Sequence, residues 1–215
     1  MSLAAALFDW DGTLLDSRAA LLAAWRESTA AEIGRIYPAT PAEEDVVFTL
    51  PGREIWPTLT HDVDTLAASF QKAYDRSGER VRAFPGVLEM LDRLRSAGVA
   101  TAVVTSKSRR RYVPDAQRSG LADAIDVAIC AEDVTATKPD PDPVLRALDR
   151  LGVSGSDALM AGDTPVDIAA AVAAGTTAVG VGWGHSPEEE LMAAGAVTVA
   201  NEPSDLVAFV LETAA

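Results

Sequence analysis

The amino-acid sequence predicts an α/β protein with a doubly wound parallel-sheet core and a second, smaller domain built only of helices. From Pro85 onward, short apolar runs alternate with helical segments of roughly ten residues. This alternation is typical of parallel strands joined by right-handed helical crossovers. Residues 17–82 contain helical periodicity and turn residues but no strand pattern, which predicts a separate helical insertion.

Composition and charge exclude several classes of protein. The chain has 215 residues, of which 48% are hydrophobic, enough for one full core and a smaller domain. Its net charge of -14 disfavours nucleic-acid binding, which requires basic surface. No apolar run is long enough to span a membrane, and no basic leader precedes the first strand. We therefore expect a cytoplasmic protein that binds neither nucleic acid nor membrane, and the single Cys130 is expected to pack in the core.

The first element is an apolar run over residues 3–8, which predicts a buried strand that ends at Asp9. Asp9 and Asp11 point the same way if the backbone stays extended, so their like charges require a cation or a shared proton. Gly12 then permits a tight turn that a β-carbon would hinder. A solvated acidic turn is the alternative interpretation of these acids.

The helical insertion comes next and sets the expected domain boundaries. A helix is predicted over residues 19–33 with Ser17 as its N-cap, and another over residues 67–74. Prolines and glycine break the chain between them into short helices and turns. We expect residues 17–82 to form this domain and residues 1–16 with 83–215 to form the core.

The remaining elements alternate to the end of the chain, with a capping box expected at Ser186–Glu189 before the penultimate helix. Strands are predicted over residues 99–104, 125–131, 158–161 and 177–181, with a short further strand over 197–199. Helices are predicted over residues 87–97, 108–119, 140–151 and 165–174, from Ser186, and at the C-terminus.

Several of these strands deliver polar residues to the same edge of the sheet. Thr105 follows one strand, Lys138 precedes a helix, and Asp163 with Asp167 follows another strand. Each has an ordinary explanation: a strand-end hydroxyl, a surface lysine, or helix capping by Asp163 or Thr164. Acids gathered at one edge would nevertheless repel each other, and Mg²⁺ is a natural counterion for carboxylates.

These motifs resemble, in order, those of the haloacid-dehalogenase-like hydrolase superfamily, with its Rossmann-like core. The first is Asp9-Trp10-Asp11-Gly12-Thr13 after an N-terminal strand. The others are Val104-Thr105-Ser106, Thr137-Lys138-Pro139 and Gly162-Asp163 with Asp167. The chain is most similar to the phosphoglycolate-phosphatase-like group, whose helical cap is inserted after the first motif. Ser106 stands where that group usually has asparagine, which leaves the substrate open.

The resemblance implies roles for the catalytic residues. Asp9 would be the nucleophile that forms an aspartyl-phosphate, and Asp11 would protonate the leaving oxygen and then activate water. Lys138 would neutralise the nucleophile and the phosphoryl group, while Thr105 would hold a phosphoryl oxygen. Ser106 and Gly12 are further candidates for phosphate binding.

The resemblance also implies a Mg²⁺ cofactor. Asp9, the backbone carbonyl of Asp11 and Asp163 would be its ligands, and Asp167 would orient a metal-bound water or Lys138. Because Asp11 is present, the dehalogenase branch, which lacks this acid, is disfavoured.

Two basic residues are candidates for substrate binding. Lys107 lies at a helix start, where cations are slightly disfavoured and a ligand-facing use is favoured. Solvated surface charge is the alternative, and the one favoured for the neighbouring arginine run. Arg53 could bind a substrate carboxylate, or form a salt bridge on the helix surface.

We therefore predict a Mg²⁺-dependent phosphatase that acts on a small phosphorylated metabolite. One alternative is a phosphosugar mutase of the same fold, and another is a catalytically idle binding or regulatory protein. The expected partner is a small-molecule phosphate ester, bound by a monomer or homodimer. The cap is expected to favour small esters over folded phosphoproteins.

Overall fold

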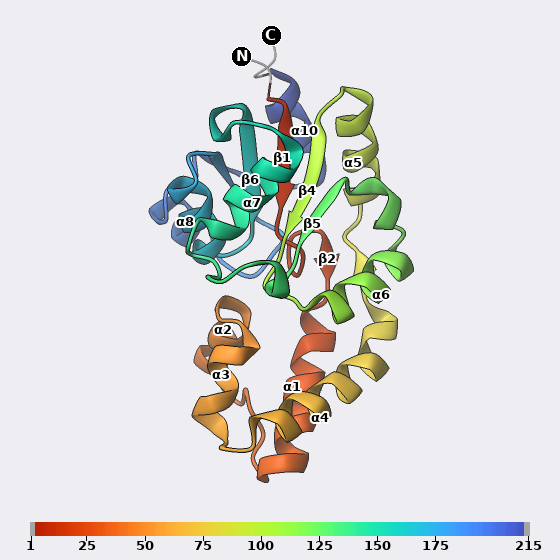
Figure 1. Ribbon diagram of the computed structural model, residues 1–215, viewed down its shortest axis with the longest axis vertical. Helices are drawn as coiled ribbons and strands as arrows, with labels where there is room; N and C mark the ends of the chain where they lie inside the picture. Colours follow the sequence, from red (N-terminus) through yellow and green to blue (C-terminus); the bar gives the residue numbers. More distant parts are fainter. Residues whose placement is uncertain (1–2, 213–215) are drawn as a thin grey trace. The chain divides into compact units, whose positions relative to one another are not determined.

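A computed structural model describes residues 3–212, and its largest feature is a six-stranded parallel sheet (Figure 1). The strand order is β5-β4-β1-β6-β7-β8, and every neighbouring pair is parallel. These strands are β1 (Ala5–Phe8), β4 (Ala100–Val104), β5 (Val127–Ile129), β6 (Ala158–Gly162), β7 (Thr177–Val181) and β8 (Thr198–Ala200). The chain builds outward from β1 on one side and then crosses to β6 on the other. In such sheets ligands bind beyond the carboxyl ends of the strands, where this reversal occurs.

Helices cover both faces of this sheet, which confirms the predicted doubly wound α/β fold. They are α5 (Val87–Ser96), α6 (Arg109–Ser119), α7 (Asp142–Leu151), α8 (Pro165–Ala173), α9 (Glu188–Ala193) and α10 (Pro203–Glu212). Alternate strand residues such as Leu7 and Met160 pack against α7, α8 and α9. Their neighbours, such as Phe8 and Leu159, are also fully buried. Burial on both faces of the sheet explains why the sequences of these strands are continuous apolar runs.

Two details of the core differ from the expectations. The strand expected over residues 125–131 is only Val127–Ile129, because short 3-10 turns flank it at Ala122–Ala124 and Ala131–Asp133. The predicted capping box at Ser186 is wrong, since Pro187 is the N-cap of α9 and no side chain caps it. Ser186 is instead buried, and its backbone N–H donates to the carbonyl of Asp163.

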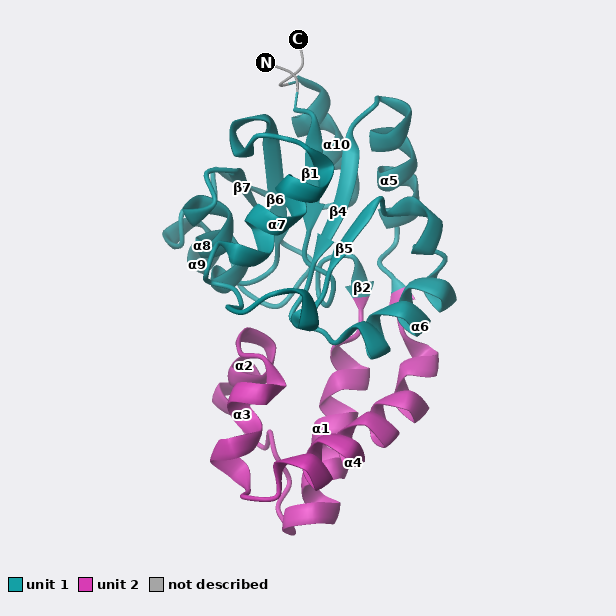
Figure 2. Cartoon of the chain, in the orientation of Figure 1, with its two compact units in different colours: residues 1–15, 83–215 teal, residues 16–82 magenta. Residues whose placement is uncertain are grey.

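The chain divides into two compact units, Met1–Leu15 with Ala83–Ala215, and Asp16–Arg82 (Figure 2). Two short strands, β2 (Leu15–Asp16) and β3 (Arg82–Ala83), pair where the chain passes between them. Among the helices of residues 3–212, none is long and apolar enough to cross a membrane.

The second unit contains only helices apart from the ends of these two strands. They are α1 (Arg18–Ile33), α2 (Pro41–Thr49), α3 (Gly52–Leu59) and α4 (Val63–Ser77), followed by a 3-10 turn at Gly78–Arg80. Ser17 is the N-cap of α1, but its side chain makes no capping bond. The core of this unit is aromatic: the ring of Trp25 lies 5.1 Å from that of Phe70 and 6.1 Å from that of Trp56. Ring packing of this kind stabilises a small domain beyond the burial of apolar area alone.

Candidate active site

The segment after β1 forms a tight loop at the carboxyl edge of the sheet. The Asp9 N–H donates to the carbonyl of Ala161 on β6, which extends the pairing of β1 by one residue. Gly12 has a φ of +92°, and a β-carbon there would lie 2.1 Å from a carboxylate oxygen of Asp163. Glycine is therefore required twice, for the positive φ and for the close approach.

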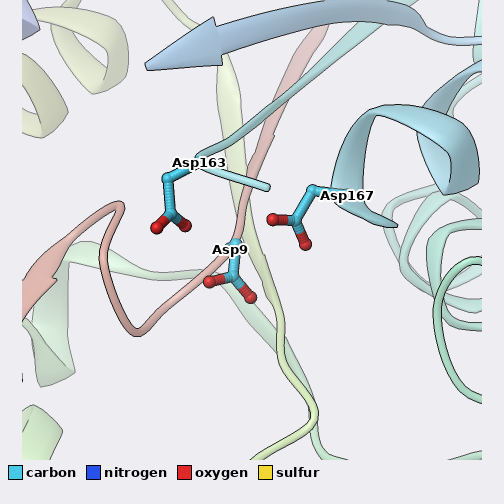
Figure 3. Close-up of side chains that lie close together, drawn as sticks. All are labelled: Asp9, Asp163 and Asp167. Carbon is cyan, nitrogen blue, oxygen red and sulfur yellow. The ribbon is translucent and has the colours of Figure 1, made fainter. Parts of the chain in front are cut away.

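Three buried carboxylates gather where the strand order reverses (Figure 3). Asp9 follows β1, Asp163 follows β6, and Asp167 lies in the first turn of α8. Each offers an oxygen within 4.8 Å of the other two, and each residue is at most 7% exposed. Hard divalent cations such as Mg²⁺ bind carboxylate oxygens, so the donor set fits such an ion.

Lys138 is the cation of this cluster. Its ammonium donates to Asp9 Oδ1, to Asp167 Oδ1 at 2.6 Å and to the carbonyl of Val104 at 3.0 Å. The side chain is 5% exposed, so this lysine is a buried group with three acceptors and not a solvated surface charge.

The electrostatics of the cluster follow from this burial. Burial raises the pKa of Asp9 to about 7; Lys138 opposes the rise, and the charges of Asp167 and Asp11 add to it. Burial and the neighbouring Asp167 and Asp9 raise the pKa of Asp163 well above its usual range. Burial alone would lower the pKa of Lys138, but attraction by Asp167 and Asp9 outweighs it and raises the pKa. One ammonium does not balance three carboxylates, so a further cation would be favoured here.

The metal-free protein is expected to lose stability as the pH rises from about 4 to about 7. Asp9 ordinarily titrates near 3.8 but near 7 in the fold, so across this window the folded chain holds a proton that the unfolded chain has released. The free energy of unfolding then falls with rising pH, by up to about 1.4 kcal/mol per pH unit for each such proton. Urea unfolding in chelator measures this slope. An Asp9→Asn variant with an equally steep slope would contradict the assignment.

The loop that follows β7 holds Asp163 in place, a role that was not predicted. The His185 N–H donates to Asp163 Oδ2 at 2.9 Å, and the Thr13 hydroxyl donates to Oδ1 at 3.0 Å. The Trp183 indole N–H in turn donates to the Thr13 carbonyl at 2.9 Å. A β-carbon at Gly184 would lie 2.1 Å from that of Asp163. The glycines of this loop are the sequence feature that permits such a close approach.

Asp167 takes part both in capping α8 and in the contact with Lys138. Its Oδ2 accepts from the Thr164 N–H at 3.1 Å and from the Thr164 hydroxyl at 2.6 Å. The Asp167 N–H in turn donates to the Thr164 hydroxyl oxygen, which completes the capping box of α8. Its Oδ1 accepts from Lys138. Thr164 is thus the N-cap, and Asp167 joins the helix start to the lysine.

The predicted phosphate- and substrate-binding residues are not members of the carboxylate cluster. Thr105 is buried after β4, and its hydroxyl oxygen accepts from the Lys107 N–H at 3.0 Å, while Ser106 is half-buried. The Lys107 side chain is 1% exposed and reaches Asp11. Arg53 is exposed on α3 in the other unit, and within residues 3–212 its side chain makes no hydrogen bond or ion pair.

The arginine run at the start of α6 and the single cysteine lie outside the cluster. The Arg109 side chain pairs with Asp133, and its backbone N–H donates to Glu132. Cys130 is fully buried, and burial raises the pKa of its thiol to about 11, so the thiol stays protonated near neutral pH. The cysteine therefore packs in the core.

Comparisons with known proteins show the family to which the chain is related. A family model described as haloacid dehalogenase-like hydrolase matches residues 6–181. The chain is 32% identical to a pyrophosphatase PpaX from Bacillus velezensis, over 83% of each chain. It is 33% identical to an N-acetylmuramic acid 6-phosphate phosphatase from Pseudomonas aeruginosa, over 96% of this chain and 94% of that one. A phosphoglycolate phosphatase from Nitrosospira multiformis is also 33% identical, over 85% of this chain and 84% of that one.

Solved structures show the same fold. A putative phosphoglycolate phosphatase from Lactobacillus plantarum superposes with a TM-score of 0.85 at 26% identity, over 97% of this chain and 99% of that one. A putative beta-phosphoglucomutase from Thermotoga maritima gives a TM-score of 0.78 at 27% identity, over 97% and 98% of the two chains.

Proposed function

The chain belongs to the haloacid dehalogenase-like hydrolase family, and we propose that it is a Mg²⁺-dependent phosphatase that hydrolyses a small phosphorylated metabolite through an aspartyl-phosphate on Asp9. The observation that carries this proposal is the buried group of Asp9, Asp163 and Asp167 with Lys138 at the point where the strand order reverses. Helix capping accounts for one of these residues, but it does not account for the group.

The proposed reaction has two displacements. A carboxylate oxygen of Asp9 attacks phosphorus, the bond from phosphorus to the leaving oxygen breaks, and Asp11 donates a proton to that oxygen. Water then attacks phosphorus and gives a proton to Asp11, and the bond to Asp9 breaks. Inorganic phosphate leaves, and the Asp9 carboxylate is restored.

The residues around Asp9 would bind the phosphoryl group. Lys138 contacts Asp9, so its ammonium would lie beside the phosphoryl oxygens as negative charge develops on them. Thr105, Ser106 and the backbone at Gly12 lie in the turns that follow β4 and β1 and are proposed as further contacts. In the helical unit, the exposed Arg53 is a candidate for a second anionic group of the substrate.

Asp9, Asp163 and the backbone carbonyl of Asp11 would hold the Mg²⁺ ion. The ion, when bound, would neutralise carboxylate charge and orient the phosphoryl group for attack. Asp167 uses one oxygen on Lys138 and the other on Thr164, so its proposed role is to orient the lysine.

Removal of the metal is expected to abolish turnover. Phosphate release should fall to background in excess chelator and return when Mg²⁺ is added. Ca²⁺ should restore it poorly, because its larger and looser coordination shell disturbs the geometry for in-line attack. Full activity in chelator would contradict the metal assignment.

The leading alternative is a phosphosugar mutase, favoured by the structural similarity to a putative beta-phosphoglucomutase. In a mutase the aspartyl-phosphate passes to a sugar hydroxyl instead of to water. Protein and Mg²⁺ should be incubated with phosphoglycolate, pyrophosphate, N-acetylmuramic acid 6-phosphate and a panel of hexose phosphates. Free phosphate would support the phosphatase, and an isomer without free phosphate would support the mutase. The absence of both products would support an idle binding protein.

A further inference from the structure

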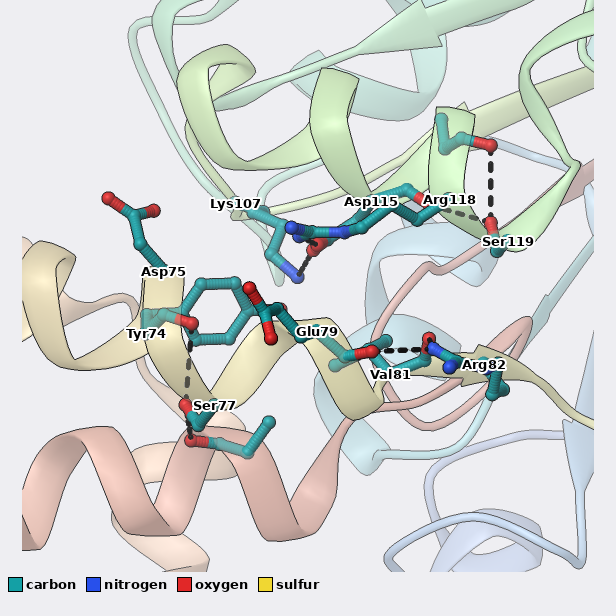
Figure 4. A network of polar contacts seen from close by, with 12 residues as sticks. Tyr74, Asp75, Ser77, Glu79, Val81, Arg82, Lys107, Asp115, Arg118 and Ser119 are labelled. Atoms are coloured by element: carbon teal, nitrogen blue, oxygen red, sulfur yellow. Dashed lines mark hydrogen bonds and ion pairs between the residues drawn. The ribbon is translucent and has the colours of Figure 1, made fainter.

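A second buried lysine lies next to the site, and the chemistry proposed above does not use it. Lys107, in the turn between β4 and α6, donates to Asp11 Oδ1 at 2.7 Å. Its ammonium also lies 2.7 Å from Asp115 Oδ2 on α6. Figure 4 draws Lys107 and Asp115 with this contact dashed. The side chains of Lys107 and Asp115 are 1% and 0% exposed. One buried cation therefore bridges a catalytic acid and an acid of a neighbouring helix.

Burying the charges of Lys107 and Asp115 costs desolvation energy, and their attraction offsets this cost only when the geometry and the hydrogen bonding are good. Asp115 also pairs with Arg118, so the contact with Asp11 supplies the second carboxylate for the two cations. The chain has three lysines: Lys72 is exposed, and the other two each contact an aspartate of the first motif. Lys138 contacts the proposed nucleophile Asp9, and Lys107 contacts Asp11.

Lys107 is itself held from several directions. Its backbone N–H donates to the Thr105 hydroxyl at 3.0 Å. Its partner Asp115 is fixed by the Arg118 guanidinium, which donates to Asp115 Oδ1 at 2.6 Å. One carboxylate thus binds a cation through each of its two oxygens, so Lys107 has little freedom to move away from Asp11.

Helix α6 also fixes the backbone of the first motif. Trp10, between Asp9 and Asp11, is fully buried, and its ring packs edge-on against Tyr112 of α6 with 4.7 Å between centroids. The same helix therefore contacts this segment twice, through Trp10 and through the bridge from Asp115. Two contacts define the direction of the Asp11 side chain better than one.

We propose that Lys107, anchored by Asp115, is a positioning residue that fixes the Asp11 carboxylate for proton transfer. The proposal rests on the proposed function, in which Asp11 protonates the leaving oxygen. It assigns Lys107 a role different from the phosphate binding that the sequence predicted, because the ammonium is directed at two protein carboxylates and is almost fully buried.

The test uses Lys107→Met, which keeps the length of the side chain and removes the ammonium. An alkyl phosphate needs its leaving oxygen protonated, whereas the nitrophenolate of p-nitrophenyl phosphate leaves without a proton. Loss of a positioned acid should lower kcat/KM for the alkyl ester by about 10- to 100-fold, part of what general acid catalysis contributes. For p-nitrophenyl phosphate, kcat/KM should change by less than about 3-fold, because kcat/KM reports the steps up to departure of the leaving group.

Two further variants keep the test decisive if the single substitution weakens folding. Lys107→Met with Asp115→Asn removes both buried charges of the pair and leaves only Arg118, which is 36% exposed, without its carboxylate, and it should show the same selective loss. Lys72→Met is the matched control, since it removes an exposed ammonium, and it should leave both esters unaffected. The Kd for Mg²⁺, measured by calorimetry, should stay within about 3-fold of the wild-type value in all three variants, because Lys107 contacts none of the proposed metal-binding carboxylates.

The outcomes separate this inference from the proposed function. Equal losses on both esters would show that Lys107 acts on the phosphoryl group or on folding, and no loss on either would show that Asp11 needs no anchor. Both results would overturn the inference while the wild type remains a phosphatase. Failure of the wild type to hydrolyse any ester would overturn the proposed function, and this inference with it.

Discussion

The Asp9→Asn variant should release no phosphate from any ester, whereas Asp11→Asn should still form a covalent phosphoenzyme. The first change removes the attacking carboxylate, so no aspartyl-phosphate can form. The second removes only proton transfer, which typically contributes about 10²- to 10⁴-fold in rate. The two acids are chemically identical and separated by one residue, but their surroundings differ. Asp9 contacts Lys138 among buried carboxylates, and the side chain of Asp11 contacts Lys107.

Beryllofluoride with Mg²⁺ distinguishes these variants directly, because it mimics an acyl-phosphate on a carboxylate oxygen. An adduct should form on the wild type and on Asp11→Asn, and it should be absent from Asp9→Asn. The measurement is the intact mass of the complex or crystallographic density at residue 9. An adduct at Asp11, or at any residue other than Asp9, would refute the assignment of the nucleophile.

Replacing Lys138 with methionine should lower kcat by about 10²- to 10³-fold, the usual cost of removing one charge-stabilising donor from an active site. The variant should also be less stable when metal-free, because Asp9 and Asp167 would lose their buried ion pairs with the ammonium. Removal of one partner of a buried ion pair typically costs about 3–5 kcal/mol. Steady-state kinetics and urea unfolding in chelator measure the two effects.

Saturating Mg²⁺ should recover part of the stability of Lys138→Met, since an ion that binds only the folded protein stabilises it. It should not restore kcat, because the ion cannot replace the contact of the ammonium with the phosphoryl oxygens. Lys72→Met again provides the control, as the exposed lysine has no role in this site. Activity of Lys138→Met near that of the wild type would remove Lys138 from the proposed mechanism.

Much of the fold could be predicted from the sequence because its signals are local. Strands buried on both faces appear as short apolar runs, and glycines such as Gly98 and Gly175, both with positive φ, follow the helices α5 and α8. The positions of Asp9 and Asp163 were also predictable, since Asp9 follows directly on an apolar run and Asp163 follows another after Gly162. Local signals were less reliable at helix starts: the Ser186 capping box is absent because that segment is bound to Asp163 instead.

The sequence by itself determined the order of the elements, the polar residues at the strand ends and the family resemblance. Only the tertiary structure decided which side chains those residues contact. Thr13 and Asp163 are 150 positions apart and become hydrogen-bonded because β1 pairs with β6. Lys107 reaches Asp11 because β4 lies on the other side of β1 and α6 follows it. Contacts of this kind depend on strand order and register, which are set by packing of the whole sheet and leave no local pattern in the chain.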